Sequence, residues 1–317
     1  MPGNDVGFAG LGAMGLQMAL RLQQSLSKQG QSPSLIAWNR TLSKAEPLTK
    51  LGAETVEHPA GLAERCSVIF TMLVDDNAVQ SVVRDILSAH PAQGTIIVEC
   101  STIYPGLTQE LEDQAQEAGC RLLSCPVFGR PDAVKAGNAL FVCAGDPAAK
   151  EQVAPLLRAM GSSILDCGTE AKAGAVMKLV GNFTFMSYVE TAAEAMALAD
   201  AGGLPRASLT AFLDRIFPGF VTKDYTETLD KDRFEPTPEK PGFKLEGGIK
   251  DAKHMRRLGT DLNAPLPLCD LFLGHMLSVR NNGGGSLDWS SLALAVRKDA
   301  GLRVKPDVFS RRQTGDE

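Results

Sequence analysis

A glycine-rich segment near the start of the chain lies between a strand pattern and a helical pattern. Residues 6–9 are an apolar run, and apolar residues at helical spacing continue from residue 16 to residue 22. In such a turn the first glycine permits a tight bend, the second lets the backbone approach a pyrophosphate, and the third lets helix and strand pack closely. Unpaired N–H groups at the helix N-terminus bind the anion. The glycine-loop residues predicted to contact a dinucleotide are Gly10, Leu11, Gly12, Ala13, Met14 and Gly15.

The end of the second strand pattern, residues 35–38, bears on the choice of cofactor. It is followed by Asn39, Arg40 and Thr41. An acidic residue there would accept hydrogen bonds from a ribose 2′-OH and would repel a 2′-phosphate. Asn39 carries no charge, and the guanidinium of Arg40 suits a phosphate. The segment favours NADPH over NADH, with a solvated loop arginine as the alternative for Arg40.

Further strand patterns alternate with helical or loop segments through the first half of the chain. They cover residues 67–73, 95–99, 121–124, 139–144 and 163–166. Repeated βα units predict an α/β protein with a doubly wound sheet, and ligands of such sheets bind beyond the carboxyl ends of the strands.

Two loops follow such strand ends. Leu73 and Val74 come after the third clear strand and are predicted to lie along the cofactor. Ser101 and Thr102 come after the fourth, where their hydroxyls could bond the nicotinamide carboxamide or a substrate oxygen. The alternative for this pair is an N-cap of the helix that begins after it.

A long helical pattern covers residues 171–199. Lys178 and Asn182 are four residues apart, so they project from one helix face, with Gly174 one turn earlier. This stripe could hold a substrate between a proton donor and an amide, while Gly174 leaves room for a flat cofactor. Apolar residues occur on nearly every side of a helix about 40 Å long. We therefore expect a partner subunit to cover part of it.

The remaining segments read as shorter helices, at residues 209–217, 243–259, 266–279 and 290–301. Between the first two lies a charged, proline-broken stretch, residues 230–242, which is either solvent-exposed or able to close over the site. The predicted organisation is a dinucleotide-binding domain at 1–168, a long interdomain helix at 169–201, an all-helical domain at 202–304 and a polar tail at 305–317.

Composition narrows the class of protein. A net charge of −5 over 317 residues, without a basic stripe, argues against a nucleic-acid partner. No apolar run approaches the length of about 18 residues that spans a bilayer, and no signal-peptide pattern opens the chain. The seven cysteines and four histidines show no metal-binding spacing. We expect a cytoplasmic protein with reduced thiols.

Four motifs together resemble the β-hydroxyacid dehydrogenase family, whose members include 3-hydroxyisobutyrate dehydrogenases. They are the glycine loop, the Ser101–Thr102 loop, the segment from Gly174 to Asn182, and a C-terminal Lys250-Asp251 pair. The resemblance implies a Rossmann-type N-terminal domain, a long interdomain helix and an all-α C-terminal domain. It also implies a homodimer with interlocked C-terminal helices.

The same resemblance implies an activity. The expected reaction is NADPH-dependent hydride transfer between the nicotinamide and a small carbonyl or alcohol substrate. Lys178 then matches the catalytic proton donor, Asn182 the substrate amide, and Lys250 a lysine that approaches the nicotinamide end of the cofactor.

One segment departs from the family pattern. Where the family usually has Pro-Val-Ser-Gly-Gly, this chain has Phe128, Gly129 and Arg130 after Pro126-Val127. An inward Phe128 would make the substrate pocket more apolar, and Arg130 could restore an anion contact. The alternatives are an imine reductase, or a non-catalytic NADPH-binding protein. Retention of Lys178 favours carbonyl or alcohol chemistry.

Overall fold

The computed structural model describes residues 5–28, 30, 35–238 and 240–304, without the side chains of residues 220 and 221. The predicted polar tail, residues 305–317, lies outside the described residues. The chain divides into two compact units, Met1–Lys178 and Leu179–Glu317. The division falls inside one helix, whereas the sequence-based boundaries treat that helix as a segment of its own.

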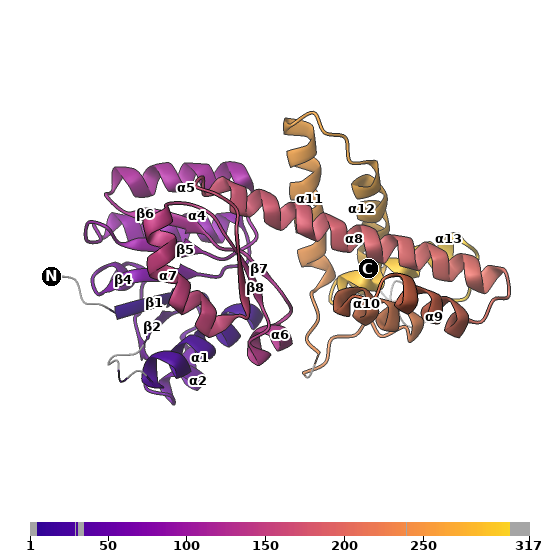
Figure 1. Cartoon of the computed structure of the whole chain (residues 1–317), viewed down its shortest axis with the longest axis horizontal. Coiled ribbons are helices and arrows are strands. Elements are labelled where there is room, and N and C mark those ends of the chain that lie inside the picture. The colour runs from indigo at the N-terminus through magenta and orange to yellow at the C-terminus, as the bar shows by residue number, and fades with distance from the viewer. Residues whose placement is uncertain (1–4, 29, 31–34, 239, 305–317) are drawn as a thin grey trace, which may run out of the picture. The chain divides into compact units, whose positions relative to one another are not determined.

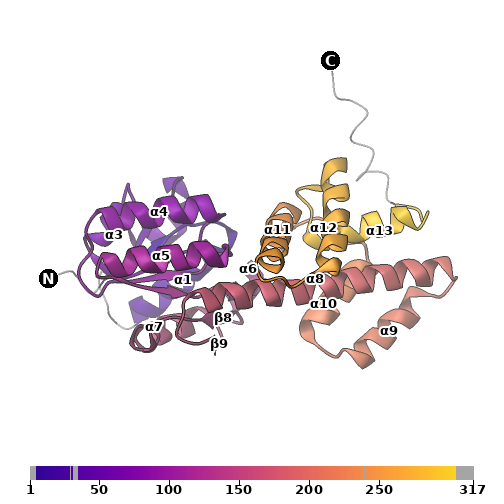
Figure 2. The same ribbon diagram turned by 90° about the horizontal axis from the view of Figure 1, so that it is seen from above.

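The first unit contains a six-stranded parallel sheet with helices on both faces, as Figures 1 and 2 show. Its strand order is β3-β2-β1-β4-β5-β6. The strands are β1 (Asp5–Ala9), β2 (Ile36–Trp38), β3 (Glu54–Thr55), β4 (Cys66–Thr71), β5 (Ile96–Glu99) and β6 (Arg121–Ser124). This order, which reverses between β1 and β4, confirms the predicted doubly wound fold.

The helices of this unit alternate with the strands. They are α1 (Ala13–Lys28), a 3₁₀ turn η1 (Leu42–Ala45), α2 (Glu46–Thr49), α3 (Ala60–Ala63), α4 (Asp76–Ser88), α5 (Pro105–Glu117), α6 (Pro131–Ala136) and α7 (Pro147–Met160). Helices α1 and α7 pack on one face of the sheet, and α3, α4 and α5 on the other. Each face therefore has its own apolar cluster.

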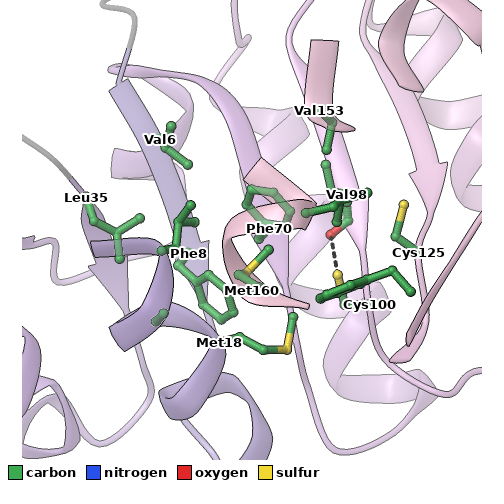
Figure 3. Packing of buried hydrophobic residues seen from close by; sticks show 14 of the residues in the cluster. Val6, Phe8, Met18, Leu35, Phe70, Val98, Cys100, Cys125, Val153 and Met160 are labelled. Carbon is green, nitrogen blue, oxygen red and sulfur yellow. Dashed lines mark hydrogen bonds between the residues drawn. The ribbon is translucent and has the colours of Figure 1, made fainter. Parts of the chain in front are cut away.

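The core beneath α1 and α7 is built from side chains of the central strands. The rings of Phe8 on β1 and Phe70 on β4 stack with their centroids 6.0 Å apart. Met18 from α1 and Met160 from α7 join the same cluster (Figure 3). Because helices cover both faces of this parallel sheet, its strands are nearly continuous apolar runs. These runs are the signal by which the strands could be predicted from the sequence.

Two of the predicted strands do not extend the large sheet. They are β8 (Leu140–Cys143) and β9 (Ser163–Asp166), which form a second sheet with β7 (Val127–Phe128) in the order β7-β8-β9. Only Cys125 and Pro126 separate β6 from β7, too few residues for the crossover that a parallel neighbour needs. Strand β7 instead pairs antiparallel with β8, and this small second sheet is a feature that the sequence analysis did not predict.

Helix α8 (Lys172–Ala201) begins in the first unit and continues into the second. The second unit adds α9 (Arg206–Ile216), α10 (Phe220–Asp230), α11 (Leu245–Asp261), α12 (Pro267–Val279), a short π turn η2 (Arg280–Gly284), a 3₁₀ turn η3 (Trp289–Leu292) and α13 (Ala293–Asp299). The four predicted short helices are present. Helix α10 was not predicted, because its polar sequence buries only Tyr225, Thr226 and Leu229 among its described side chains.

The charged stretch between α10 and α11 is anchored at two points in the second unit. Phe234 is buried, and its carbonyl oxygen accepts a hydrogen bond of 2.8 Å from the backbone N–H of Asp288. The Asp288 carboxylate accepts another, also 2.8 Å, from the N–H of Phe243. The described charged residues between these anchors, Glu235 and Lys240, are exposed. A role as a lid over the site stays a prediction.

A hydrogen bond between a half-buried histidine and a buried glutamate joins α8 to α12 in the second unit. Nδ1 of His275 lies 2.6 Å from the Oε1 atom of Glu190, whose side chain is buried. This hydrogen bond raises the pKa of His275 above its ordinary value. His275 therefore links two helices of the second unit. Among the described residues, no helix is long and apolar enough to cross a membrane, and no cluster of side chains has the make-up of a metal site.

Candidate active site

The glycine loop between β1 and α1 combines two tight contacts with one open position. Gly10 has a positive φ of 103°, and a Cβ placed there would lie 2.3 Å from the Met72 carbonyl oxygen. A Cβ at Gly15 would lie 2.0 Å from the carbonyl oxygen of Gly10. A Cβ at Gly12 would meet no atom within 4 Å. Gly10 and Gly15 are thus needed for packing, while Gly12 leaves space where a pyrophosphate could approach the start of α1.

Asn39, at the end of β2, braces this loop. Its Oδ1 accepts a hydrogen bond of 2.8 Å from the Leu11 N–H, and its Nδ2 donates one of 2.8 Å to the Thr41 carbonyl. Both ends of the amide are therefore used in joining the glycine loop to the loop after β2. Arg40, next in sequence, is exposed. Of the residues predicted to select the cofactor, Arg40 has an exposed charged side chain, and Asn39 holds the two loops together by hydrogen bonds.

The loops after β4 and β5 are held together by Ser101 and Glu99. The N–H of Leu73 donates to the Ser101 Oγ at 2.8 Å. The buried Glu99 carboxylate accepts hydrogen bonds from the Thr71 hydroxyl and from the Ser101 N–H. The alternative that Ser101 or Thr102 caps the next helix was wrong, since the N-cap of α5 is Tyr104. Val74 is exposed beside this network.

Lys178 lies on α8, beside β7 in the first unit. Its Nζ donates a 2.7 Å hydrogen bond to the Val127 carbonyl oxygen and lies 4.1 Å from the centroid of the Phe128 ring. The residue is only 9% exposed. A carbonyl dipole and the face of an aromatic ring both favour an ammonium cation. Phe128, which departs from the family pattern, is therefore a direct neighbour of the predicted proton donor.

The space beside Gly174, where a side chain is missing, is occupied by Ser124. A Cβ there would lie 2.8 Å from both the carbonyl oxygen and the Oγ of Ser124. This glycine lets α8 pack against the end of β6, and Ser124 occupies the space that the sequence-based hypothesis gave to a flat cofactor. Gly129, which follows β7, has a φ of 140°, and Arg130 is the N-cap residue of α6.

Asn182 and Lys250 share one partner in the second unit. The Asn182 Nδ2 donates to Oδ2 of Asp251 at 2.8 Å, and the Lys250 Nζ lies 3.1 Å from Oδ1 of the same carboxylate. Asp251 is fully buried on α11. Neither Asp251 nor Glu99 was singled out from the sequence as a site residue. For Glu99 the one available signal was an acidic residue at the end of an apolar strand pattern, whereas Asp251 already belonged to the Lys250-Asp251 motif, in which only the lysine was given a role.

Comparison with known proteins gives one family match for the N-terminal part of the chain and another for the C-terminal part. Residues 5–168 match the family profile described as the NAD binding domain of 6-phosphogluconate dehydrogenase. Residues 173–296 match the family profile described as NAD-binding of NADP-dependent 3-hydroxyisobutyrate dehydrogenase. The fold, its glycine loop and these matches define an NAD(P)-dependent oxidoreductase, a dehydrogenase or reductase acting on CH–OH or C=O groups.

One relative that matches over nearly its full length narrows the class to a family, and two solved structures share the fold. An uncharacterized oxidoreductase of Bacillus subtilis is 30% identical over 92% of this chain and 99% of its own length. A 3-hydroxyisobutyrate dehydrogenase of Mycobacterium tuberculosis, solved with L-serine, has a TM-score of 0.80 at 24% identity and covers 93% of this chain and 99% of its own. An imine reductase of Myxococcus stipitatus with NADP+ has a TM-score of 0.60 at 22% identity, covering 91% of this chain and 98% of its own. The chain belongs to the β-hydroxyacid dehydrogenase family.

Proposed function

We propose that the protein is an NADPH-dependent reductase that interconverts a small carbonyl compound and its alcohol, with Lys178 as proton donor and acceptor. The observation that carries this proposal is the environment of Lys178. Its ammonium group is almost fully buried against the Val127 carbonyl and the Phe128 ring. Such a fixed cation is suited to a substrate oxygen on which negative charge develops.

The chain's own residues divide the work of this reaction. A nicotinamide cofactor, when bound, supplies or accepts the hydride. Lys178 donates a hydrogen bond and then a proton to the substrate oxygen, and takes the proton back in the reverse direction. The Val127 carbonyl and the Phe128 ring hold its Nζ in place. Asp251 orients the Asn182 amide, which we propose as a substrate contact, and pairs with Lys250, which we propose as a cofactor contact.

The hydrogen bonds between the loops after β4 and β5 position the residues of the first unit that we propose as contacts to the cofactor and the substrate. Glu99 fixes the backbone of Ser101, and Ser101 fixes the backbone of Leu73. We propose Leu73 and Val74 as cofactor contacts and Thr102 as a contact to either ligand. The departure at residues 128–130 gives the substrate wall an aromatic ring and a guanidinium. An acid-bearing substrate would use Arg130 for its carboxylate.

A turnover screen tests the proposed reaction. With NADPH in excess, short semialdehydes are expected to be reduced, and cyclic imines to react slowly or not at all. With NADP+ in excess, the matching 3-hydroxyacids are expected to be oxidised. The imine reductase alternative is kept because Phe128 adds apolar surface at the site. Faster turnover of a cyclic imine than of any semialdehyde would replace the carbonyl proposal with that alternative.

Arg40→Ala is expected to weaken NADPH binding about 10- to 100-fold and to leave NADH binding nearly unchanged. The reason is the loss of a charge-assisted hydrogen bond to the 2′-phosphate, worth about 1.5–3 kcal/mol. Titration of each cofactor by fluorescence or calorimetry measures both dissociation constants. Lys50→Ala is the matched control, because Lys50 is an exposed cation of the same unit, paired with Glu46 at 2.7 Å. Equal losses for both cofactors would remove Arg40 from 2′-phosphate recognition.

We propose a homodimer formed through the second unit. Apolar side chains at the end of α8 and along α9 are exposed: Leu198, Leu204, Phe212, Ile216 and Phe217. A large exposed apolar surface is typical of a subunit interface. Light scattering on the full chain should give twice the mass of one chain, and a monomer mass would contradict the proposal. A cytoplasmic location is likewise our proposal, based on the odd number and scattered positions of the cysteines.

A further inference from the structure

Cys125 and Cys143 face each other across an antiparallel pairing in the first unit. Ser124 and Ala144 exchange two backbone hydrogen bonds, of 3.0 and 2.9 Å, and Val127 pairs with Phe141 further along. This register places Cys125 directly opposite Cys143. The pair flanks a doubly hydrogen-bonded one, so it occupies a non-hydrogen-bonded position, where Cα atoms lie about 4.5 Å apart. That separation falls within the range that a disulfide spans, about 4.4–6.8 Å.

The two thiols are already in contact. The Cys125 Sγ donates to the Cys143 Sγ over 3.1 Å, and both residues are buried. Cys125 lies in the same apolar cluster as Cys100 (Figure 3). The Cys100 thiol donates instead to the Val98 carbonyl at 3.7 Å. Of the buried sulfurs in this cluster, Cys125 and Cys143 are the two that the strand register aligns.

We propose that Cys125 and Cys143 are a redox modification site, which a small peroxide converts to a disulfide and a dithiol converts back. In the first step the Cys143 sulfur attacks a peroxide oxygen. An S–O bond forms as the O–O bond breaks, and the departing oxygen leaves as water or an alcohol after taking a proton. In the second step the Cys125 sulfur attacks the sulfenic sulfur, and hydroxide leaves with the Cys125 proton as water. Two thiols are oxidised, and one peroxide is reduced.

The chemistry of the two thiols supports these separate roles. The hydrogen bond from Cys125, together with the nearby Lys150 cation, lowers the pKa of Cys143. Burial raises the pKa of Cys125 well above its usual value. The thiolate is the reactive form, so Cys143 is the attacking sulfur and Cys125 the resolving one. Access requires local opening, for which the two-residue strand β7 has few backbone bonds to break.

Oxidation at this pair reaches the proposed catalytic lysine through a short segment. Cys125 is two residues before Val127, whose carbonyl accepts the Lys178 hydrogen bond, and three before Phe128, whose ring contacts the Lys178 Nζ. A covalent link to β8 shortens the 3.1 Å sulfur contact to about 2 Å and so shifts residues 125–128 slightly against Lys178. This consequence rests on the proposed role of Lys178, whereas disulfide formation does not.

The test uses the full chain, hydrogen peroxide and peptide mapping under non-reducing conditions after free thiols have been alkylated. We expect a linked Cys125–Cys143 peptide, an intact mass lower by two hydrogens, and full reversal by dithiothreitol. Cys143→Ser should abolish the mass loss, and Cys120→Ala, which removes another buried thiol of the unit, should retain it. Unmodified thiols, a link from Cys143 to Cys100 or Cys167, or over-oxidised Cys143 alone would each overturn the proposal. The wild-type map decides the question even if the variants fold poorly.

Turnover measured on the same samples separates the two parts of the inference. Oxidised wild-type protein should lose about tenfold in kcat, because displaced catalytic groups cost rate steeply. Dithiothreitol should restore it, and Cys143→Ser should keep its rate in peroxide. A mapped disulfide with unchanged kcat would overturn the link to Lys178 and leave the modification site standing. A mapped disulfide in a protein that turns over no carbonyl or imine would remove the proposed function alone.

Discussion

Replacing Lys178 by alanine is expected to lower kcat by about 10²–10⁴-fold, the range that general acid–base catalysis contributes. Lys178 is almost fully buried, and its Nζ is held by the Val127 carbonyl and the Phe128 ring. In the proposed reaction, this side chain donates the proton to the substrate oxygen. The glycine loop lies elsewhere in the unit, so the dissociation constant of NADPH should change little. Steady-state kinetics and cofactor titration measure the two quantities separately.

Two further variants separate chemistry from packing. Lys178→Met keeps an unbranched chain against the Phe128 ring and removes the charge, so it should be as inactive as Lys178→Ala. Lys172→Ala removes an exposed lysine from the first turn of the same helix, where it pairs with Glu170 at 3.1 Å, and should leave kcat unchanged. Turnover comparable to wild type in both Lys178 variants would take this residue out of the reaction.

Gly12→Ala is expected to weaken NADPH binding by about 10- to 100-fold, equivalent to about 1.4–2.8 kcal/mol, without lowering the stability of the protein. The added methyl group would meet no protein atom within 4 Å. It would stand where the second glycine of such a loop admits the pyrophosphate. Cofactor titration and thermal unfolding of the free protein are the two measurements, and the expected result is a large change in the first alone.

Gly15→Ala is the contrasting variant. Its Cβ would lie 2.0 Å from the Gly10 carbonyl oxygen, so α1 and the loop must move apart in the folded protein itself. We expect a loss of stability of about 1–3 kcal/mol, the usual cost of overpacking, together with weaker cofactor binding. If Gly12→Ala destabilised the free protein as much as Gly15→Ala, or if it bound NADPH normally, the loop would not hold the pyrophosphate in the proposed way.

The fold could be predicted wherever a segment carried its own periodic signal. Strands β1, β4 and β5 are mostly apolar because both faces of the sheet are covered. Strand β7 has two residues, too few to show a period, and its antiparallel pairing depends on a partner more than ten residues away. An apolar run indicates a strand but does not identify its neighbour. The separate small sheet therefore could not be seen in the sequence.

The candidate site was predicted where a motif is continuous in sequence. The glycine loop and the Lys178 helix are such motifs. The roles of Glu99 and of Asp251, which the sequence analysis named only as part of a motif, were not predicted because they arise from pairing: Glu99 accepts from Thr71, 28 residues earlier, and Asp251 accepts from Asn182, 69 residues earlier. Gly174 was misjudged for the same reason, because Ser124 fills its gap from another element.

The brace formed by Asn39 has a consequence for any attempt to redesign cofactor choice. Asn39→Asp is the obvious change toward NADH, because an acidic side chain there would bind a ribose 2′-OH. The new carboxylate could still accept from the Leu11 N–H, but it would have no hydrogen to offer the Thr41 carbonyl, 2.8 Å away. A carboxylate oxygen of the new aspartate would then lie against the Thr41 carbonyl oxygen, beside the glycine loop. If Asn39 also contributes to cofactor choice as we propose, a change at this position alters the architecture of the loop as well.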